Sequence, residues 1–396
     1  MTLPNNRELT DPERTASIAP LGLASNSPAE NGVVPENRNL PPEQGDPLWL
    51  ILGPQGLRAG WCILLFATLV YLFANIFGTL ISSVVEGALH LKFAGQTASS
   101  SIVGELAWVL ALAATFAIMA RIERRRFLDY NLARPAAAPF MSGLLSGFVA
   151  LSVLVAVMAW GGWIRFGPTP QYHAHAFSYA ALWAVAFVLV ALTEEGGFRC
   201  YLQFTLTRGL NFWWAVVLVG TICLWDFTQP TKHGTGGVYA MAALGLVPCL
   251  YIHLRTTPRD GFWQAAWVGS TMFGSIHTGN NGETWIGILA TGAIGFVFCV
   301  SVRLTGSAWW AIGFHGAWDW AETFFYGTAD SGYVAKGHLF TTSPAGSALW
   351  SGGTVGPEGS ILILPLILIL LLALALLYGR KRDRLASVRV AENLAS

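Results

Sequence analysis

Charged residues are scarce in this sequence. They make up 11% of the 396 residues, whereas hydrophobic residues make up 54%, and a soluble domain is about 25% charged. This composition excludes an ordinary soluble globule and predicts a chain that is surrounded largely by lipid. The formal net charge of +1 provides no strong field for capturing nucleic acid, so we expect no nucleic-acid partner.

The sequence also lacks the familiar patterns of a metal or redox centre. Its five cysteines lie in apolar segments without C-x-x-C spacing, so we interpret them as small core residues. No H-E-x-x-H motif occurs, which excludes the zinc-binding helix of soluble metalloproteases. The cysteines are Cys62, Cys200, Cys223, Cys249 and Cys299.

Aromatic residues are absent from residues 1–47, which hold 8 of the 19 prolines. A segment of this composition buries too little apolar surface to fold, so it is predicted to be a disordered cytosolic tail. It lacks the basic start and apolar stretch of a cleavable signal peptide, and we expect the first membrane helix to direct insertion. Residues 48–380 are predicted to form a helical membrane domain, and residues 381–396 a basic cytosolic C-terminal tail.

Ten apolar runs lie within the predicted membrane domain. No water satisfies backbone groups inside a bilayer, so a spanning segment must be a helix or part of a closed barrel. Runs of this length without period-2 alternation predict helices. The predicted fold class is all-α, a polytopic integral membrane helical bundle with about ten transmembrane helices. The runs are 61–83, 104–120, 138–162, 177–206, 212–225, 237–254, 262–277, 284–303, 306–325 and 360–378.

The distribution of Lys and Arg between these runs predicts their orientation. If the N-terminal tail is cytoplasmic, the inner loops hold fifteen basic residues and the outer loops hold four. Cytoplasmic loops carry the basic excess in membrane proteins, so both termini are predicted to be cytoplasmic. The inner residues are Arg121, Arg124, Arg125, Arg126, Arg134, Arg199, Arg208, Arg255, Arg259, Arg303, Arg380, Lys381, Arg382, Arg384 and Arg389, and the outer residues are Lys92, Arg165, Lys232 and Lys336.

Two adjacent glutamates and an arginine interrupt the run 177–206, in the sequence T-E-E-G-G-F-R over residues 193–199. Ionisable residues inside a span are costly and usually face a partner or a cavity. Residues i and i+4 share a helical face, so Glu195 is predicted to pair with Arg199 and Glu194 to point elsewhere. An unpaired, desolvated glutamate suits general-base work on a water molecule. The alternative is a buried ion pair that only ties helices together.

Two histidine motifs follow in later runs. Phe273 and His277 are four residues apart, as are His315 and Asp319, so each pair shares a helical face. Taken alone, His277 could be a satisfied histidine at the end of a span, and the second pair could be a hydrogen bond that fastens its helix. Glu322, seven residues beyond His315, is interpreted as a structural residue near the outer end of its span.

Three motifs thus follow one another along the chain, namely E-E-x-x-x-R at Glu194, Glu195 and Arg199, F-x-x-x-H at Phe273 and His277, and H-x-x-x-[ND] at His315 and Asp319. In this order they resemble the CPBP family of intramembrane proteases, which joins the CAAX prenyl endopeptidases to bacterial bacteriocin-processing and self-immunity proteins. The resemblance covers about residues 180–325. The stretches 305–315 and 352–360 also look like those of bacterial members, although we assign no catalytic role to the glycines of the second stretch.

The resemblance implies hydrolysis of a peptide bond inside the membrane. The implied roles are activation of the water by Glu194 and His277, shaping of the site by Glu195 and Arg199, and stabilisation of the oxyanion by His315 and Asp319. This agrees with the helical spacing, which already leaves Glu194 as the unpaired base.

The sequence departs from the family at Asp319, where many members carry Asn. An ionised Asp would repel an oxyanion, so this residue must be protonated, pair with His315, or bind a metal. A desolvated site can hold such a carboxylic acid neutral. Alternatively, Glu194, His277 and His315 are candidate ligands for a divalent metal such as zinc. We expect no stably bound metal, and zinc is the alternative cofactor.

The second departure is the separation of 78 residues between Glu195 and Phe273. Two additional helices, near 212–225 and 237–254, would fill it. Because two helices are inserted, the later helices keep their orientation in the membrane. The extra pair could nevertheless cover or reshape the substrate entrance. The predicted topology also places His277 towards the outer end of its helix. Its convergence with the first motif therefore requires a tilted helix or a re-entrant segment.

The predicted function is that of an intramembrane endopeptidase that acts on a membrane-embedded or membrane-delivered peptide. Its expected partners are membrane lipid and a peptide or membrane-protein substrate. The bacterial look of the chain favours processing of a bacteriocin, a pheromone or a membrane protein in a bacterial inner membrane, over a prenylated CAAX substrate. The alternatives are a non-catalytic scaffold or bacteriocin-immunity protein of the same fold, or an ion-coupled transporter.

Overall fold

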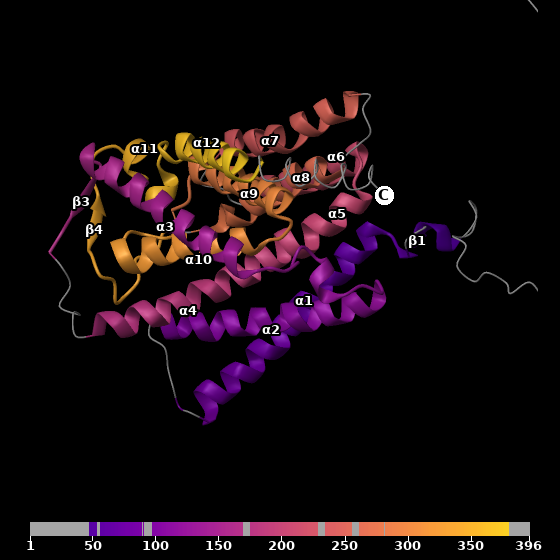
Figure 1. The fold of residues 1–396 in the computed structure, drawn as a ribbon, viewed down its shortest axis with the longest axis horizontal. Helices are drawn as coiled ribbons and strands as arrows, with labels where there is room; N and C mark the ends of the chain where they lie inside the picture. Colours follow the sequence, from indigo (N-terminus) through magenta and orange to yellow (C-terminus); the bar gives the residue numbers. More distant parts are fainter. Residues whose placement is uncertain are drawn as a thin grey trace, which may run out of the picture. The chain divides into compact units, whose positions relative to one another are not determined.

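The computed structural model describes most of the predicted membrane domain (Figure 1). The described residues are 47–53, 56–88, 90, 97–168, 175–228, 234–255, 261–280 and 282–379. The two predicted tails, at 1–47 and 381–396, lie outside these residues except for Pro47.

A helix occupies the position of every predicted run, which confirms the helical membrane bundle. Among the described residues, five helical segments are long and apolar enough to cross a membrane, namely Ala59–Ala88, Ala98–Ile122, Ala137–Trp160, Ala176–Gly209 and Trp285–Thr305. The α-helices of the described residues are α1 (Ala59–Ser82), α2 (Ala98–Ile122), α3 (Ala137–Trp160), α4 (Ala176–Glu195), α5 (Gln203–Gly209), α6 (Phe212–Thr228), α7 (Gly234–Leu254), α8 (Gly261–Ile276), α9 (Trp285–Thr305), α10 (Trp309–Trp320), α11 (Ala348–Ser351) and α12 (Ile363–Leu374).

Several of these helices continue into π-helical segments. These segments are η2 (Ser83–Ala88), η5 (Gly196–Leu202), η7 (Ala321–Tyr326) and η9 (Ala375–Gly379). The first and third motifs each lie where an α-helix changes into a π-helix, because η5 begins directly after Glu195 and η7 begins two residues after Asp319. Such wide turns shift the residues that follow to another face of the helix, and they are frequent at functional sites.

The remaining elements are short. The 3₁₀ turns are η1 (Pro47–Leu50), η3 (Phe127–Asp129), η6 (His277–Gly279) and η8 (Pro357–Gly359). Strands β1 (Leu52–Gly53) and β2 (Gly56–Leu57) form one antiparallel pair. Strands β3 (Ile164–Phe166) and β4 (Thr342–Pro344) form another, with Arg165 opposite Ser343. This second pair joins the segment after α3 to the segment before α11.

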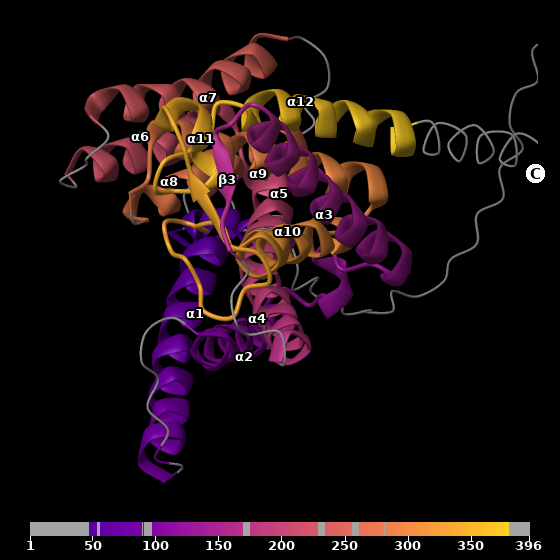
Figure 2. The same cartoon turned by 90° about the vertical axis from the view of Figure 1, so that its left-hand side faces the viewer.

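Helix α10, which carries the third motif, packs against both α3 and α4, and α4 also packs against α2 (Figures 1 and 2). Helices α8 and α9 pack against each other, and α12 packs against α9. The largest hydrophobic core is centred on α10, where Trp310, Phe314 and Trp318 lie among residues of α3, α9 and α12. The motif-bearing helices are therefore held from several sides by buried side chains.

Glycines bring α3 and α10 into direct backbone contact. A Cβ atom at Gly143 would lie 2.2 Å from the carbonyl oxygen of Trp310, and one at Gly147 would lie 2.2 Å from that of Phe314. Gly313 on α10 makes the reciprocal close approach to the backbone of α3. Small residues commonly allow such contacts between membrane helices. These contacts hold α10 against α3 at Gly313 and Phe314, directly before the motif residue His315.

Helix α8 begins at the end of α5 and runs back beside it. A Cβ atom at Gly261 would lie 2.5 Å from the Thr207 carbonyl oxygen, and the Gln203 side-chain amide donates to the Phe262 carbonyl at 3.2 Å. From Gly261 to His277 the chain rises about 24 Å, and from Thr207 back to the end of α4 it rises about 20 Å. The run 262–277 is therefore a short helix whose end is level with the glutamate motif.

The two additional helices, α6 and α7, pack against α8. Their buried residues Ala215, Val219 and Cys249 share a core cluster with Ala265 and Val268 of α8. Helix α7 also packs close to Gly274 and Gly292, where a Cβ atom would lie 2.7 Å from the Met241 methyl group and 3.1 Å from a Leu244 methyl group, respectively. The extra pair thus supports α8 and α9.

Large apolar side chains are exposed along several helices. Examples are Tyr71, Leu145, Trp213, Val247 and Leu368, each of which is more than half exposed. Soluble monomers rarely expose extensive apolar patches, whereas a bilayer surrounds such side chains with hydrocarbon of similar polarity. The exposed surface therefore supports an integral membrane protein.

Substitution of Gly147 by Val should force α3 and α10 apart, because the added carbons would overlap the Phe314 carbonyl. Overpacking of this kind costs about 1–3 kcal/mol, so we expect a lower midpoint of thermal unfolding for the protein purified in detergent. Gly104→Val is the control, because nothing lies within 4 Å of a Cβ at this position on α2. Equal midpoints for the two variants would contradict the close backbone contact.

The predicted orientation can be tested with cysteines introduced at the exposed residues Arg126 and Arg165. A membrane-impermeant maleimide should label Arg165→Cys in intact cells, and it should label Arg126→Cys only after the membrane is opened, because the basic loop is expected inside. The unsubstituted chain is the control for background labelling, because Cys223 is partly exposed, whereas Cys62, Cys200, Cys249 and Cys299 are buried. The reverse labelling pattern would show that the topology is inverted.

Candidate active site

The first motif is built around a buried ion pair. Glu195 and Arg199 are 0% and 1% exposed, and the Arg199 Nε lies 3.1 Å from the Glu195 Oε2. The Arg199 Nη1 also donates to the Glu195 Oε1 at 3.3 Å. This confirms the predicted i,i+4 pairing. It also corrects the loop count, because Arg199 lies inside the bundle and is not a charge of a cytoplasmic loop.

Aromatic rings surround the guanidinium of Arg199. Its Cζ atom lies 4.0 Å from the ring centre of Phe273, 5.2 Å from that of Phe298 and 5.7 Å from that of Phe198. A guanidinium over the face of an aromatic ring is stabilised by the ring quadrupole, and more so when it is desolvated. The Phe of the second motif therefore contacts the Arg of the first, which the sequence pattern alone did not show.

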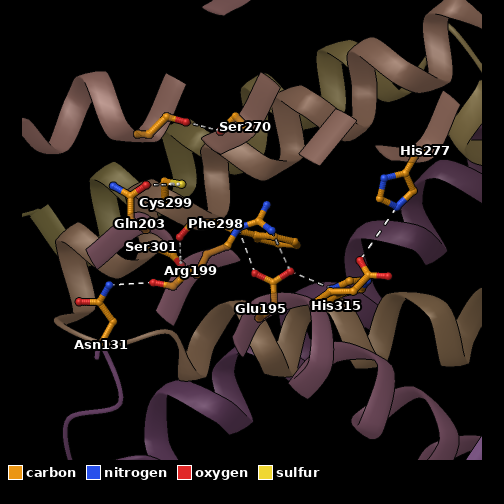
Figure 3. Close-up of polar contacts among 12 residues, drawn as sticks. Asn131, Glu195, Arg199, Gln203, Ser270, His277, Phe298, Cys299, Ser301 and His315 are labelled. Atoms are coloured by element: carbon orange, nitrogen blue, oxygen red, sulfur yellow. Dashed lines mark hydrogen bonds and ion pairs between the residues drawn. The ribbon is translucent and has the colours of Figure 1, made fainter. Parts of the chain in front are cut away.

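The Glu195 carboxylate also contacts the third motif (Figure 3). The His315 Nδ1 lies 3.0 Å from the Glu195 Oε1, the same oxygen that accepts from Arg199. A donor at Nδ1 fixes the imidazole ring and turns its Nε2 towards the cavity. Glu195 thus links two motifs that are separated by 120 residues.

The second glutamate points away from this ion pair, as predicted. The Glu194 Oε2 lies 4.0 Å from the Nε2 of His277 and 3.9 Å from the Nε2 of His315. This oxygen is buried and has no hydrogen-bond partner in the described part of the chain. Polar atoms about 4 Å apart are commonly bridged by water. The expected convergence of Glu194 and His277 is therefore present, and the short length of α8 produces it.

The tautomer of His277 follows from its other nitrogen. The Nδ1 lies 2.7 Å from the Phe273 carbonyl oxygen, which can only accept a hydrogen bond, so Nδ1 carries the proton. In the neutral imidazole the Nε2 is then an acceptor. A water molecule between Glu194 and His277 would donate one proton to each of them.

Asp319 contacts the second ring nitrogen of His315. Its Oδ2 is 3.4 Å from the His315 Nε2. Of the three states that the sequence left open for Asp319, the contacts match pairing with His315. His315 therefore lies between Glu195 on one side and Asp319 on the other, and both carboxylates favour its protonated form.

A cavity of about 260 Å³ opens beside these groups. Glu194, His277, His315 and Asp319 line one part of it, and its remaining walls are largely apolar. The apolar lining comes from α4, α9 and α12, and includes Trp183, Phe187, Val190, Ile294, Phe298, Ile363, Leu366, Ile367 and Leu370. No described residue of α6 or α7 is among the lining residues, so the described part of the extra pair does not form a wall of this cavity.

Sequence analysis missed residues in loops that hold the site in place. The Asn131 side-chain amide donates to the Arg199 carbonyl at 2.7 Å (Figure 3), and the Asn131 carbonyl accepts from the Ala308 N–H at 2.8 Å. These two hydrogen bonds connect the first motif to the start of α10. Asn131 has a positive φ of 56°, which Asn tolerates better than most residues, but a single polar residue in a loop gave no signal in the sequence.

The predicted zinc ligands Glu194, His277 and His315 surround the same space. Two ligands of a tetrahedral zinc ion are about 3.3–3.4 Å apart, because each lies 2.0–2.1 Å from the metal. The observed separations of 3.9 and 4.0 Å from the glutamate oxygen are longer. Among the described residues, these three do not form a group whose ligand atoms all lie within 4.8 Å of one another. The donor types suit zinc, but their spacing does not fit it.

Comparison with known proteins identifies one family. Residues 246–321 match the family model of type II CAAX prenyl endopeptidase Rce1-like proteins, and this segment contains the second and third motifs. No curated protein and no solved structure matches the chain. The matched family is a protease family, which supports hydrolase activity in general. The match confirms the resemblance of this chain to the CPBP/CAAX intramembrane proteases.

Proposed function

We propose that the protein is an intramembrane endopeptidase that hydrolyses a peptide bond with a water molecule activated by Glu194 and His277. One observation carries the proposal. The buried, unpartnered Glu194 Oε2 lies about equally far from the imidazoles of His277 and His315, at 4.0 and 3.9 Å. This arrangement supports the proposal, because one water molecule in the space between these groups could contact a base, a second acceptor and an imidazole donor inside a largely apolar cavity.

The two acceptors orient the attacking water. Its protons point to the Glu194 carboxylate and the His277 Nε2, so a lone pair on its oxygen is free to attack the peptide carbonyl. The new C–O bond forms as Glu194 takes a proton, and the carbonyl oxygen becomes an oxyanion. Collapse of this intermediate breaks the C–N bond, and Glu194 returns the proton to the leaving amine.

His315 is the group that stabilises the oxyanion. Its Nδ1 is held by Glu195 and its Nε2 faces the space beside Glu194. In the protonated imidazolium both nitrogens are donors. A fixed cationic donor in a site that excludes water stabilises developing negative charge strongly. Asp319 holds the ring and balances its charge, and in this role its carboxylate need not bind the oxyanion itself.

The apolar walls indicate the class of substrate. Aliphatic side chains of α12 and aromatic side chains of α4 face the cavity, so they suit a hydrophobic peptide segment that is delivered from the membrane. The substrate we propose is a membrane-embedded or membrane-delivered peptide, such as a bacteriocin, a pheromone or a membrane protein of a bacterial inner membrane.

Replacement of Glu194 by Gln should abolish proteolysis without loss of the protein. Removal of a general base typically slows a reaction about 10²–10⁴-fold, so peptide N-termini that this enzyme creates should disappear. The measurement compares new N-termini in membranes of cells that express the natural protein or Glu194→Gln at matched abundance. Glu283→Gln is the control, because Glu283 is also buried but does not line the cavity.

Identical N-termini in the two membranes would contradict the protease. If a phenotype of the natural protein also persisted in Glu194→Gln, the scaffold or immunity protein would replace the protease as the favoured function. Loss of the same N-termini in Glu283→Gln would show that any buried carboxylate of this bundle is needed, and it would remove the specific role of Glu194.

Replacement of Glu195 by Gln should have a different effect from replacement of Glu194. It leaves Arg199 buried without its counter-ion, and breaking a buried ion pair costs about 3–5 kcal/mol. We therefore expect Glu195→Gln to lower both the amount of folded protein and its midpoint of unfolding in detergent, and Glu194→Gln to change neither. Equal midpoints for the two variants would show that the Glu195–Arg199 pair does not stabilise the bundle.

A further inference from the structure

A second group of acidic side chains lies next to the cavity. Glu322 belongs to η7, Asp330 to the loop after it, and Glu358 to η8. One carboxylate oxygen from each lies within 4.8 Å of the other two. The group is separate from Glu194 and the histidines, and the proposed hydrolysis does not use it.

Glu322 is the member that needs a partner. Its side chain is 0% exposed, and neither of its carboxylate oxygens has a hydrogen-bond partner in the described part of the chain. A buried carboxylate without a hydrogen bond is rare and costly. The interpretation of Glu322 as an ordinary structural residue near the outer end of its span does not account for this environment.

The other two carboxylates are held in fixed orientations. The Trp318 indole N–H donates to the Glu358 Oε1 at 3.0 Å, and the Thr323 hydroxyl donates to the Asp330 Oδ2 at 2.8 Å. Hydrogen bonds of this kind commonly orient the ligands of a metal ion.

The glycine-rich stretch at 352–360 makes the cluster sterically possible. Gly356 has a φ of 103°, and a Cβ atom there would lie 2.0 Å from the Ala329 carbonyl oxygen and 3.3 Å from the Glu322 Oε1. Only a residue without a side chain allows this approach. Gly356 thus lets the loop bring Glu358 close to Glu322 and Asp330, which explains a stretch for which sequence analysis found no role.

Three negative charges in one buried group repel one another. Within the described residues, none of the three forms an ion pair with Lys or Arg. This repulsion is relieved when a cation enters the group.

We infer that Glu322, Asp330 and Glu358 bind a hard divalent cation, for which Ca²⁺ is the best fit. Carboxylate oxygens are the preferred ligands of Ca²⁺, at 2.3–2.6 Å. Two oxygens on opposite sides of such an ion are at most about 5.2 Å apart, so three oxygens within 4.8 Å of one another can all reach one ion. Ca²⁺ accepts flexible coordination by six to eight oxygens, whereas Mg²⁺ requires near-ideal octahedral geometry and usually keeps several waters.

The site would connect two loops to the wall of the cavity. Asp330 and Glu358 both line the cavity beside His315 and Asp319, and Glu358 is bonded to Trp318 on α10. A bound cation would hold the loop at 327–331 and the loop at 352–360 against the third motif. This site is distinct from the zinc ligands considered for the catalytic water.

Calcium binding to the full-length protein in detergent tests the inference. We expect the natural protein to bind one Ca²⁺ per chain by titration with radioactive Ca²⁺ after removal of bound metal. Glu322→Gln and Glu358→Gln should weaken this binding at least tenfold. Glu123→Gln is the matched control, because it removes a buried carboxylate that pairs with Arg125 and Arg208 and is not part of the cluster, and it should bind Ca²⁺ as the natural protein does.

The midpoint of thermal unfolding provides a second readout that does not depend on proteolysis. Calcium should raise the midpoint of the natural protein and leave that of Glu322→Gln unchanged. In chelator, Glu322→Gln should be at least as stable as the natural protein, because the substitution removes repulsion. If the Glu322 carboxyl group were simply protonated, calcium would leave the unfolding midpoints of both proteins unchanged.

Two results would overturn the inference. One is the absence of binding to the natural protein at millimolar Ca²⁺, and the other is unchanged binding in Glu322→Gln and Glu358→Gln. If these variants do not fold, Thr323→Val decides, since it retains all three carboxylates and removes only the hydrogen bond that orients Asp330. Loss of such a supporting contact typically weakens metal binding about 10–100-fold, so equal affinity would count against the site.

Discussion

The buried ion pair of Glu195 and Arg199 is the interaction on which the site depends. Neither charge is tolerable alone inside a membrane bundle, and the pair is stable because each partner is satisfied in several directions. Arg199 lies among the rings of Phe198, Phe273 and Phe298, and the Glu195 Oε1 also accepts from His315. Because one glutamate is fully engaged in this way, the adjacent Glu194 is left to face the cavity.

The depth at which the groups meet follows from helix lengths. Glu194 lies 18 residues after the start of a 34-residue helical segment, about 27 Å from one end and about 22 Å from the other. His277 reaches the same level because α8 begins beside Thr207 and ends after 16 residues. The α-helix ends at this depth and the 3₁₀ turn η6 follows it, which a membrane protein tolerates where the segment is buried in protein or lines a cavity.

Helical periodicity made the local part of this arrangement predictable. The i,i+4 spacing identified the pairs Glu195–Arg199 and His315–Asp319, and apolar run lengths located the helices. Periodicity says nothing of contacts between helices, so the bond from His315 to Glu195 and the role of Asn131 could not be found in this way. The same limit applies to Glu322, whose surroundings are determined by a loop that returns more than 30 residues later. Arg199 was counted as a loop charge because composition does not reveal burial.

The two acidic groups lie close enough to influence each other. His315, Asp319 and Glu322 follow one another at i, i+4 and i+7 along α10 and η7, so Glu322 lies about 10 Å from His315 along the axis. Carboxylates at this distance repel an oxyanion that forms beside His315, and the repulsion is stronger in a site that excludes water. A divalent cation bound by Glu322, Asp330 and Glu358 would offset this repulsion. Occupation of the second group would therefore favour formation of the tetrahedral intermediate at the first.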